Sequence, residues 1–139
     1  MVKATWIDGI GFSAETPSGH MLVVDSGEEE HGGKNRGPSP LECLLLAVAA
    51  CSAMDVISIL RKKRQAVRAY RVEVEGDRVP PGEWPRPYRS IRVRHFVSGD
   101  SIDQDAVARA VELSDTKYCS VIATLREQPD VRSEWLIEG

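Results

Sequence analysis

Two cysteines that lie far apart in the sequence are the residues best suited to chemistry. Cys51 stands near the middle of a long apolar segment, and Cys119 lies in the first turn of a shorter segment that is also expected to be helical. A thiolate can attack the O–O bond of a peroxide, and a second thiol nearby can condense with the resulting sulfenic acid before further oxidation destroys it. If the two helices pack together, the pair predicts thiol peroxidase chemistry; inert packing of two small core residues is the alternative.

The two thiols are expected to have different surroundings. The start of a helix stabilises negative charge on sulfur, which favours a thiolate at Cys119. Cys51 lacks this help in mid-helix and needs a cation or hydrogen-bond donor from another segment, because burial raises the pKa of a thiol. Asp55 follows one turn later and either lines a cavity or bonds to a neighbouring element. The third cysteine, Cys43, lies about two turns before Cys51, too far along the helix axis to bond with it.

Several common catalytic patterns are absent from the sequence. It has no G-x-S-x-G nucleophile elbow, no G-x-x-x-x-G-K-[ST] phosphate loop and no C-x-x-C pair. His95 is expected on the surface of a sheet rather than as a catalytic base, since no nucleophile lies near it in the sequence. Neither a metal site nor a cofactor is expected, because the His and Cys residues lack convergent spacing and the consecutive residues 28–31 cannot readily surround one ion.

Length and composition predict one domain, residues 1–139, with a single hydrophobic core. The net charge of -3 gives no electrostatic footprint for nucleic acid. The first residues lack the apolar run of a secretion signal, which favours a cytoplasmic protein. The long apolar segment approaches the length of a membrane span, but Asp55 lies well inside it, and a charge near the bilayer centre costs about 2.5–3.5 kcal/mol. A core helix without membrane contact is therefore the prediction.

The long apolar segment, residues 39–65, is the expected centre of the fold. Ser39 suits the N-cap, Pro40 suits the first helical position, and Glu42 completes a capping box. The apolar residues do not keep to one stripe, which predicts burial on most of the helix circumference. Before this helix, residues 2–7, 11–16 and 20–25 are expected to form an antiparallel β-meander, followed by a polar loop over residues 26–37.

The second half of the chain predicts a hairpin followed by helices. Residues 69–79 and 90–97 alternate apolar and charged side chains across a proline-rich connection, which places Ile91, Val93 and His95 on one face. Residues 102–113 and 118–127 are expected helices with a break between them, and residues 130–138 are expected to form a closing strand. Helices and strands are thus segregated rather than alternating, and the fold class is α+β.

Two stretches of the sequence carry a family resemblance: NRGPSPLECLLLAVAACSAMDVISIL, residues 35–60, and LSDTKYCSV, residues 113–121. They resemble the OsmC/Ohr family of hydroperoxide reductases, in particular its less characterised OsmC-like branch. The expected order of elements fits that family over nearly the whole chain. The resemblance implies an OsmC-like fold, an intertwined homodimer with the long helices packed centrally, and active sites at the subunit interface.

The resemblance also implies roles for particular residues. Cys51 would be the peroxidatic thiol that reduces an organic hydroperoxide to an alcohol, and Cys119 would resolve the sulfenic acid to a disulfide. An external dithiol reductant or a lipoylated protein would then reduce that disulfide. Arg36, the only arginine before the long helix, is the candidate for holding the thiolate.

Two positions depart from the pattern of the well-studied members. Leu41 follows the helix-starting proline where those members have glutamate, and Glu42 comes one residue later. Because one residue turns a side chain by about 100° around a helix, Glu42 is either the catalytic carboxylate or only the capping-box partner. Ser120 follows Cys119 where the peroxidase branches usually have proline.

The leading prediction is a cytoplasmic, homodimeric thiol peroxidase that acts on organic hydroperoxides as part of an antioxidant stress response. The alternative is a non-catalytic module of the same fold that holds an apolar ligand in an interfacial cavity near Cys51 and Asp55. In that case the cysteines are packing residues.

Overall fold

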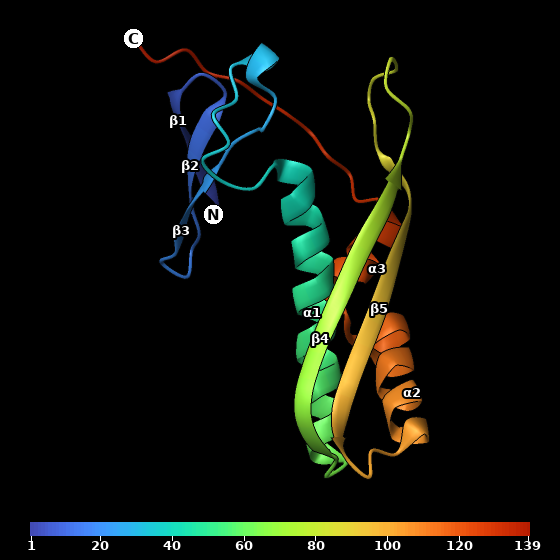
Figure 1. Cartoon of the computed structure of the whole chain (residues 1–139). Helices are drawn as coiled ribbons and strands as arrows, with labels where there is room; N and C mark the ends of the chain where they lie inside the picture. Colours follow the sequence, from blue (N-terminus) through green and yellow to red (C-terminus); the bar gives the residue numbers. More distant parts are fainter. The chain divides into compact units, whose positions relative to one another are not determined.

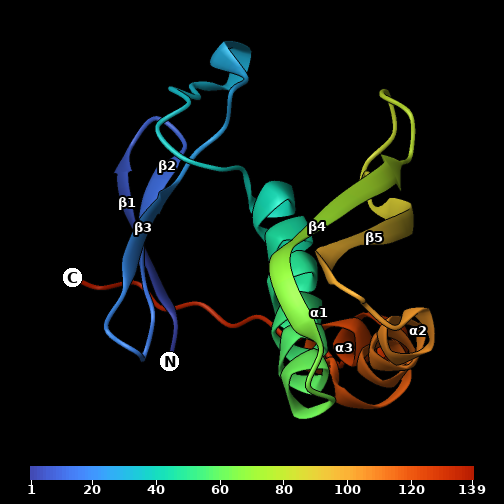
Figure 2. The same ribbon diagram turned by 60° about the horizontal axis from the view of Figure 1, so that its bottom comes forward.

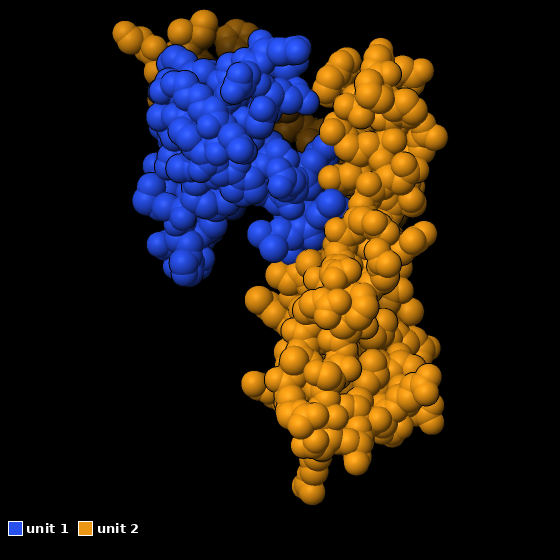
Figure 3. Space-filling view, in the orientation of Figure 1, with its two compact units in different colours: residues 1–47 blue, residues 48–139 orange.

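The computed structural model describes every residue from Met1 to Gly139 and contains two compact units, residues 1–47 and 48–139 (Figure 3). The secondary structure consists of five strands and three α-helices, together with one short 3-10 turn and one π-helical turn. Helix α1 (Pro40–Lys62) starts within residues 1–47 and ends within residues 48–139. The predicted α+β class is confirmed.

The first unit is built on a three-stranded antiparallel sheet in the order β1-β2-β3. Strand β1 (Lys3–Asp8) pairs with β2 (Gly11–Glu15), and β2 pairs with β3 (Met21–Val24). Gly9 closes the first hairpin with a φ of 52°, a left-handed conformation that suits glycine. The predicted meander is therefore confirmed, and the loop after it contains one short turn, η1 (Glu29–His31).

Helix α1 begins with the predicted capping box. The Ser39 Oγ accepts a hydrogen bond from the Glu42 N–H at 3.2 Å, and the Glu42 Oε1 accepts one from the Ser39 N–H at 3.1 Å. These two bonds satisfy N–H groups that would otherwise lack a partner at the helix start. Local sequence alone therefore determines where this helix begins.

The second unit combines a long hairpin with helices on one of its faces. Strand β4 (Ala66–Arg78) pairs in antiparallel fashion with β5 (Tyr88–Asp100), as the alternating sequence predicts. Figures 1 and 2 show the part of α1 in this unit, α2 (Gln104–Leu113) and α3 (Ser120–Glu127) on the same side of the hairpin. Between α2 and α3 the predicted break is a π-helical turn, η2 (Ser114–Tyr118).

Two apolar clusters join α1 to the later helices and to the inner face of the hairpin. The first contains buried Val48, Cys119 and Ile122, with residues of both strands packed against it. The second contains buried Val56, Leu60 and Ala110. Together they bury one stripe of α1 at four-residue spacing, which is the spacing that keeps side chains on one helix face. The buried residues of this stripe are Val48, Ser52, Val56 and Leu60.

Burial of α1 is narrower than the sequence predicts. Leu46 and Met54 are 63% and 69% exposed, so the single chain covers one face of the helix rather than most of its circumference. By length and composition alone α1 also meets the requirements of a membrane span, with Asp55 inside it. An uncovered apolar helix face is typical of a surface that contacts another molecule.

The predicted closing strand over residues 130–138 is wrong. Residues 128–139 contain neither helix nor strand. A strand needs a neighbouring strand edge to pair its N–H and C=O groups, and the local sequence does not show whether such an edge is present. Apolar side chains in this segment are 82–86% exposed, namely Val131, Trp135, Leu136 and Ile137.

Candidate active site

Cys51 and Cys119 lie together in the second unit, although 67 residues separate them in the chain. Their Sγ atoms and a carboxylate oxygen of Asp55 all lie within 4.8 Å of one another. Both cysteines are free thiols; Cys119 is 3% exposed and Cys51 is half-buried. The packing of α1 against the start of α3 thus produces a cluster of two thiols and one carboxylate, which we call the thiol cluster.

The η2 turn places Cys119 at the start of α3. Cys119 leaves the helical conformation with φ -72° and ψ 100°, and its Sγ accepts a hydrogen bond from the Ile122 N–H at 3.4 Å. Burial raises the pKa of the Cys119 thiol, the Ile122 N–H opposes this rise, and Cys51 adds to it. Burial therefore outweighs the stabilisation that the helix start was expected to give a thiolate at this position.

Helix α1 supplies the other two members of the thiol cluster. Cys51 and Asp55 are four residues apart, so they lie on the same side of the helix, next to the buried stripe. The Ser114 Oγ, which is 1% exposed at the start of η2, donates a hydrogen bond to the Asp55 Oδ2 at 2.9 Å. This bond answers the question left by the sequence: Asp55 bonds to a neighbouring element.

A line of polar side chains continues from Asp55 to the hairpin. The Ser52 Oγ lies 3.3 Å from the Ser114 Oγ and 3.4 Å from the His95 Nε2, and the His95 Nδ1 lies 2.7 Å from the Tyr70 hydroxyl. The Ser114 hydroxyl is the donor toward both the Asp55 Oδ2 and the Ser52 Oγ. Because a hydroxyl has one proton and an ionised carboxylate only accepts, the shorter bond to Asp55 takes that proton. The Ser52 and Tyr70 hydroxyls are thus the partners of the two His95 ring nitrogens.

The two ring residues of this line titrate away from their usual ranges. Burial lowers the pKa of His95, with a smaller opposing effect of Asp115. Burial, followed by the charge of Asp55, raises the pKa of Tyr70. His95 is therefore a half-buried residue on the inner face of the hairpin, with the predicted alternation but more contacts than a surface residue would have.

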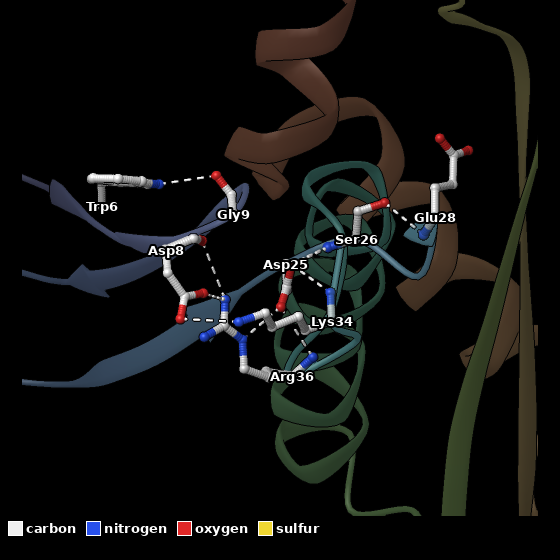
Figure 4. Close-up of polar contacts among 8 residues, drawn as sticks. All are labelled: Trp6, Asp8, Gly9, Asp25, Ser26, Glu28, Lys34 and Arg36. Carbon is white, nitrogen blue, oxygen red and sulfur yellow. Dashed lines mark hydrogen bonds and ion pairs between the residues drawn. The ribbon is translucent and has the colours of Figure 1, made fainter. Parts of the chain in front are cut away.

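The first unit contains a different polar cluster around Arg36 (Figure 4). The Arg36 Nε donates to the Asp25 Oδ2 at 2.8 Å, and its Nη2 lies 2.8 Å from the Asp8 Oδ1. The Lys34 Nζ bonds the other Asp8 oxygen at 3.1 Å. Gly11 provides space for this arrangement, because a Cβ at residue 11 would collide with the Arg36 guanidinium. We call these four charged residues the arginine cluster.

Asp25 is the buried centre of the arginine cluster. Besides the Arg36 side chain, its oxygens accept from three backbone N–H groups, and Asp25 as a whole is 2% exposed. The hydrogen bond from Arg36, followed by that from the Ser26 N–H, holds the pKa of Asp25 well below its usual range. The bond from Lys34 likewise lowers the pKa of Asp8. Arg36, the arginine that the resemblance selected, thus has two carboxylate partners within its own unit.

The remaining candidate residues also have identifiable positions. Glu42 uses its side chain in the capping box with Ser39. Cys43 is a half-buried free thiol near the start of α1. The sequence did not identify Asp25, Ser114 or Tyr70, although one signal was available: Ser114 directly follows a predicted helix inside the stretch 113–121, which also contains Cys119.

Comparisons with known proteins agree with this fold. The family model described as OsmC-like protein matches residues 32–134. Protein YhfA of Escherichia coli strain K12 is 37% identical over 129 residues, which cover 93% of this chain and 91% of YhfA.

Solved structures of other proteins are also similar to this chain. A hypothetical protein from Aquifex aeolicus VF5 matches with a TM-score of 0.77 and 30% identity, over 91% of this chain and 86% of that chain. An organic hydroperoxide resistance protein OsmC from Legionella pneumophila has the same fold, with a TM-score of 0.63 and 18% identity over 91% of this chain and 88% of its own. Because the family model matches most of this chain, the chain belongs to the OsmC-like family.

Proposed function

We propose that this protein is a dithiol peroxidase that reduces organic hydroperoxides to alcohols. The observation that carries the proposal is the position of the Cys51 and Cys119 sulfur atoms, which lie within 4.8 Å of one another as free thiols. Peroxide chemistry with two cysteines needs a second thiol within reach of the first, so that the sulfenic acid is captured before it is oxidised further. Cys119 meets that need for Cys51.

The proposed reaction has two steps at sulfur. The Cys51 thiolate attacks one oxygen of the O–O bond, which breaks; the other oxygen leaves as alkoxide, takes up a proton and departs as the alcohol, and Cys51 becomes a sulfenic acid. The Cys119 thiol then attacks the Cys51 sulfur, the S–O bond breaks, and the hydroxide leaves with the Cys119 proton as water. An external dithiol, free or on a lipoylated protein, reduces the disulfide by thiol–disulfide exchange.

Asp55, Arg36 and Glu42 have different proposed roles, which follow from their charges. The Asp55 carboxylate close to both sulfur atoms can accept a proton, but a negative charge there disfavours a thiolate. The reactive thiolate therefore needs a cation, and Arg36 is the proposed source, with Glu42 as the proposed carboxylate that positions it. The ion pairs of Arg36 with Asp25 and Asp8 and the capping role of Glu42 are the competing explanations for these two residues.

A similar protein supports the choice of substrate. The Legionella pneumophila protein with the same fold is described as an organic hydroperoxide resistance protein. Its identity to this chain is 18%, so the support for function comes from the shared fold together with the cysteine pair found here.

We extend the proposal to a homodimer in which the exposed apolar face of α1 is covered by a second copy. Leu46 and Met54 on α1 are mostly exposed, as are the apolar side chains of residues 128–139. Exposed apolar surface of this kind favours association. Light scattering coupled to size-exclusion chromatography should give twice the chain mass, whereas a monomer at micromolar concentration would contradict the dimer.

A hydroperoxide titration tests the enzymatic proposal. One equivalent of cumene hydroperoxide added to the fully reduced protein should consume two thiols and give a disulfide between Cys51 and Cys119 in peptide mass spectrometry. Cys51→Ser should abolish turnover with a dithiol reductant, and Cys43→Ser is the matched control because it removes a thiol from the same helix outside the cluster. Thiols that stay reduced in excess hydroperoxide would exclude the peroxidase.

A further inference from the structure

The thiol cluster brings together three side chains that are metal ligands in other proteins. Its two sulfur atoms and one carboxylate oxygen come from α1 and from the residue that caps α3, and all lie within 4.8 Å of one another. Zinc binds cysteine sulfur at about 2.3 Å and carboxylate oxygen at about 2.0–2.2 Å, so tetrahedral ligand atoms are about 3.5–3.8 Å apart. Small side-chain rotations would bring the three atoms to that spacing.

We propose that Cys51, Asp55 and Cys119 form a binding site for one Zn²⁺ ion per chain. Two cysteine ligands select a thiophilic cation such as Zn²⁺ over Mg²⁺ or Ca²⁺, which prefer oxygen ligands. Three protein ligands leave the fourth tetrahedral position for water or a small exogenous ligand. Residue spacing did not indicate a metal site here, since the three ligands come from segments that only the fold brings together.

The charge of the cluster favours a cation. The partners of Asp55 and Cys119 are a hydroxyl, a thiol and backbone N–H groups, and none of them is a lysine or arginine side chain. Deprotonated, the three groups place like charges close together in a partly buried site, which is unfavourable unless a cation lies between them. A divalent ion reverses this effect, because it stabilises the thiolates and the carboxylate at once.

Hydrogen bonds already hold two of the ligands in place. The Ser114 hydroxyl donates to the Asp55 Oδ2 at 2.9 Å, and the Ile122 N–H donates to the Cys119 Sγ at 3.4 Å. Groups that orient metal ligands in this way contribute to metal affinity without touching the metal. Behind Ser114, the line through Ser52 and His95 fixes the hydroxyl that orients Asp55.

Cobalt provides a direct test on the reduced, full-length protein after treatment with a chelator. Titration with Co²⁺ without oxygen should produce the near-ultraviolet absorption of thiolate-to-cobalt charge transfer and visible bands of tetrahedral Co²⁺, saturating at one ion per chain. Binding should release about two protons, one from each thiol. Zn²⁺ should bleach the bands by displacing Co²⁺. A wild-type protein that shows no charge-transfer absorption with millimolar Co²⁺ would overturn the proposal.

Five variants test the ligand assignment. Cys51→Ser and Cys119→Ser should each lose most of the charge-transfer absorption, whereas Cys43→Ser should retain it; the opposite pattern would overturn the proposed ligand set. Asp55→Asn should bind Co²⁺ more weakly than Ser114→Ala, which should lose about 10–100-fold in affinity while keeping one ion per chain. Far-ultraviolet circular dichroism of each variant checks that it is folded.

The metal measurements do not depend on the proposed peroxidase. A protein that binds Co²⁺ through both thiols but never forms a disulfide with hydroperoxide would contradict the proposed function and support the metal site. A protein that forms the disulfide but gives no cobalt absorption would do the reverse.

Discussion

Each unit of the protein holds a carboxylate inside a polar cluster, and the two carboxylates have different partners. Asp25 in the arginine cluster accepts from a guanidinium and from three backbone N–H groups. Asp55 in the thiol cluster accepts from the neutral hydroxyl of Ser114 and lies beside two thiols. One carboxylate is therefore neutralised within its unit, and the other has a neutral hydrogen-bond donor and lies close to two thiols.

The different partners of Asp25 and Asp55 suit a structural role for Asp25 and a chemical role for Asp55. A buried carboxylate with a full set of donors fixes its surroundings, and its removal leaves those donors without partners. A carboxylate without a cationic partner contributes less to folding and is available to a proton or a metal ion. This comparison explains why Asp25 anchors a loop to a sheet, whereas Asp55 belongs to the candidate active site.

The largest predicted effect is that of Zn²⁺ on the rate of disulfide formation at the thiol cluster. This prediction rests on both the proposed peroxidase and the proposed metal site. At a Zn²⁺ concentration 100 times the Kd, about 1% of the protein is metal-free, so disulfide formation with hydroperoxide should slow by about 100-fold. Rapid-quench thiol labelling measures the rate with and without Zn²⁺. Mg²⁺ at the same concentration is the control and should have no effect. An unchanged rate with Zn²⁺ bound would show that the metal leaves Cys51 free to react.

Replacing Asp25 by asparagine should destabilise the first unit, whereas replacing Asp55 by asparagine should change the stability of the second unit little. Asp25→Asn removes the charge that holds the Arg36 guanidinium, and hydrogen–deuterium exchange of peptides from residues 1–47 should speed up by about tenfold or more. Asp55→Asn keeps an oxygen that accepts from Ser114, so exchange in residues 48–139 should change by less than about threefold. Similar effects of the two substitutions would remove the distinction between the clusters.

The parts of the fold that depend on neighbouring residues could be predicted from the sequence. The capping box between Ser39 and Glu42 spans four residues, and the alternation in β4 and β5 needs only the strand itself. The closing strand could not be predicted in the same way, because a strand also needs a neighbouring strand to pair with, and residues 130–138 form no strand. The prediction that α1 is buried on most of its circumference failed for a related reason, since the sequence shows which residues are apolar but not what covers them.

Prediction of the candidate site from the sequence had the same limit. Periodicity placed Asp55 one turn after Cys51 and put His95 on the inner face of its strand. It could not show that Ser114 reaches Asp55 or that Tyr70 reaches His95, because those contacts depend on helix packing and on strand register. The proximity of Cys51 and Cys119 came from the family resemblance, not from their spacing. Asp25 was missed because its donors come from the loop after it, whose shape the sequence does not give.

Mild acid should destabilise the second unit before the first. Burial lowers the pKa of folded His95, while an unfolded histidine titrates near about 6.5, so unfolding takes up a proton below that pH and stability falls as the pH drops. The lowered pKa of Asp25 has the same sign but acts only below about pH 4, where an unfolded aspartate gains its proton. Exchange measured at pH 7 and pH 5, corrected for the intrinsic rate, should therefore increase in residues 48–139 only. His95→Gln should remove most of this increase, and an equal increase in both units would contradict the assignment.

The smallest predicted effect concerns the far end of the polar line. Tyr70→Phe removes the hydroxyl that hydrogen-bonds the His95 Nδ1 at 2.7 Å but keeps the ring that stacks on the imidazole. Loss of one such hydrogen bond costs about 0.5–1.5 kcal/mol, which urea unfolding should show as a lower midpoint with an unchanged m-value. Cobalt affinity should stay within about threefold of wild type, because Ser114 still orients Asp55. A loss of affinity as large as that of Ser114→Ala would mean that the whole line, and not Ser114 alone, holds the carboxylate in position.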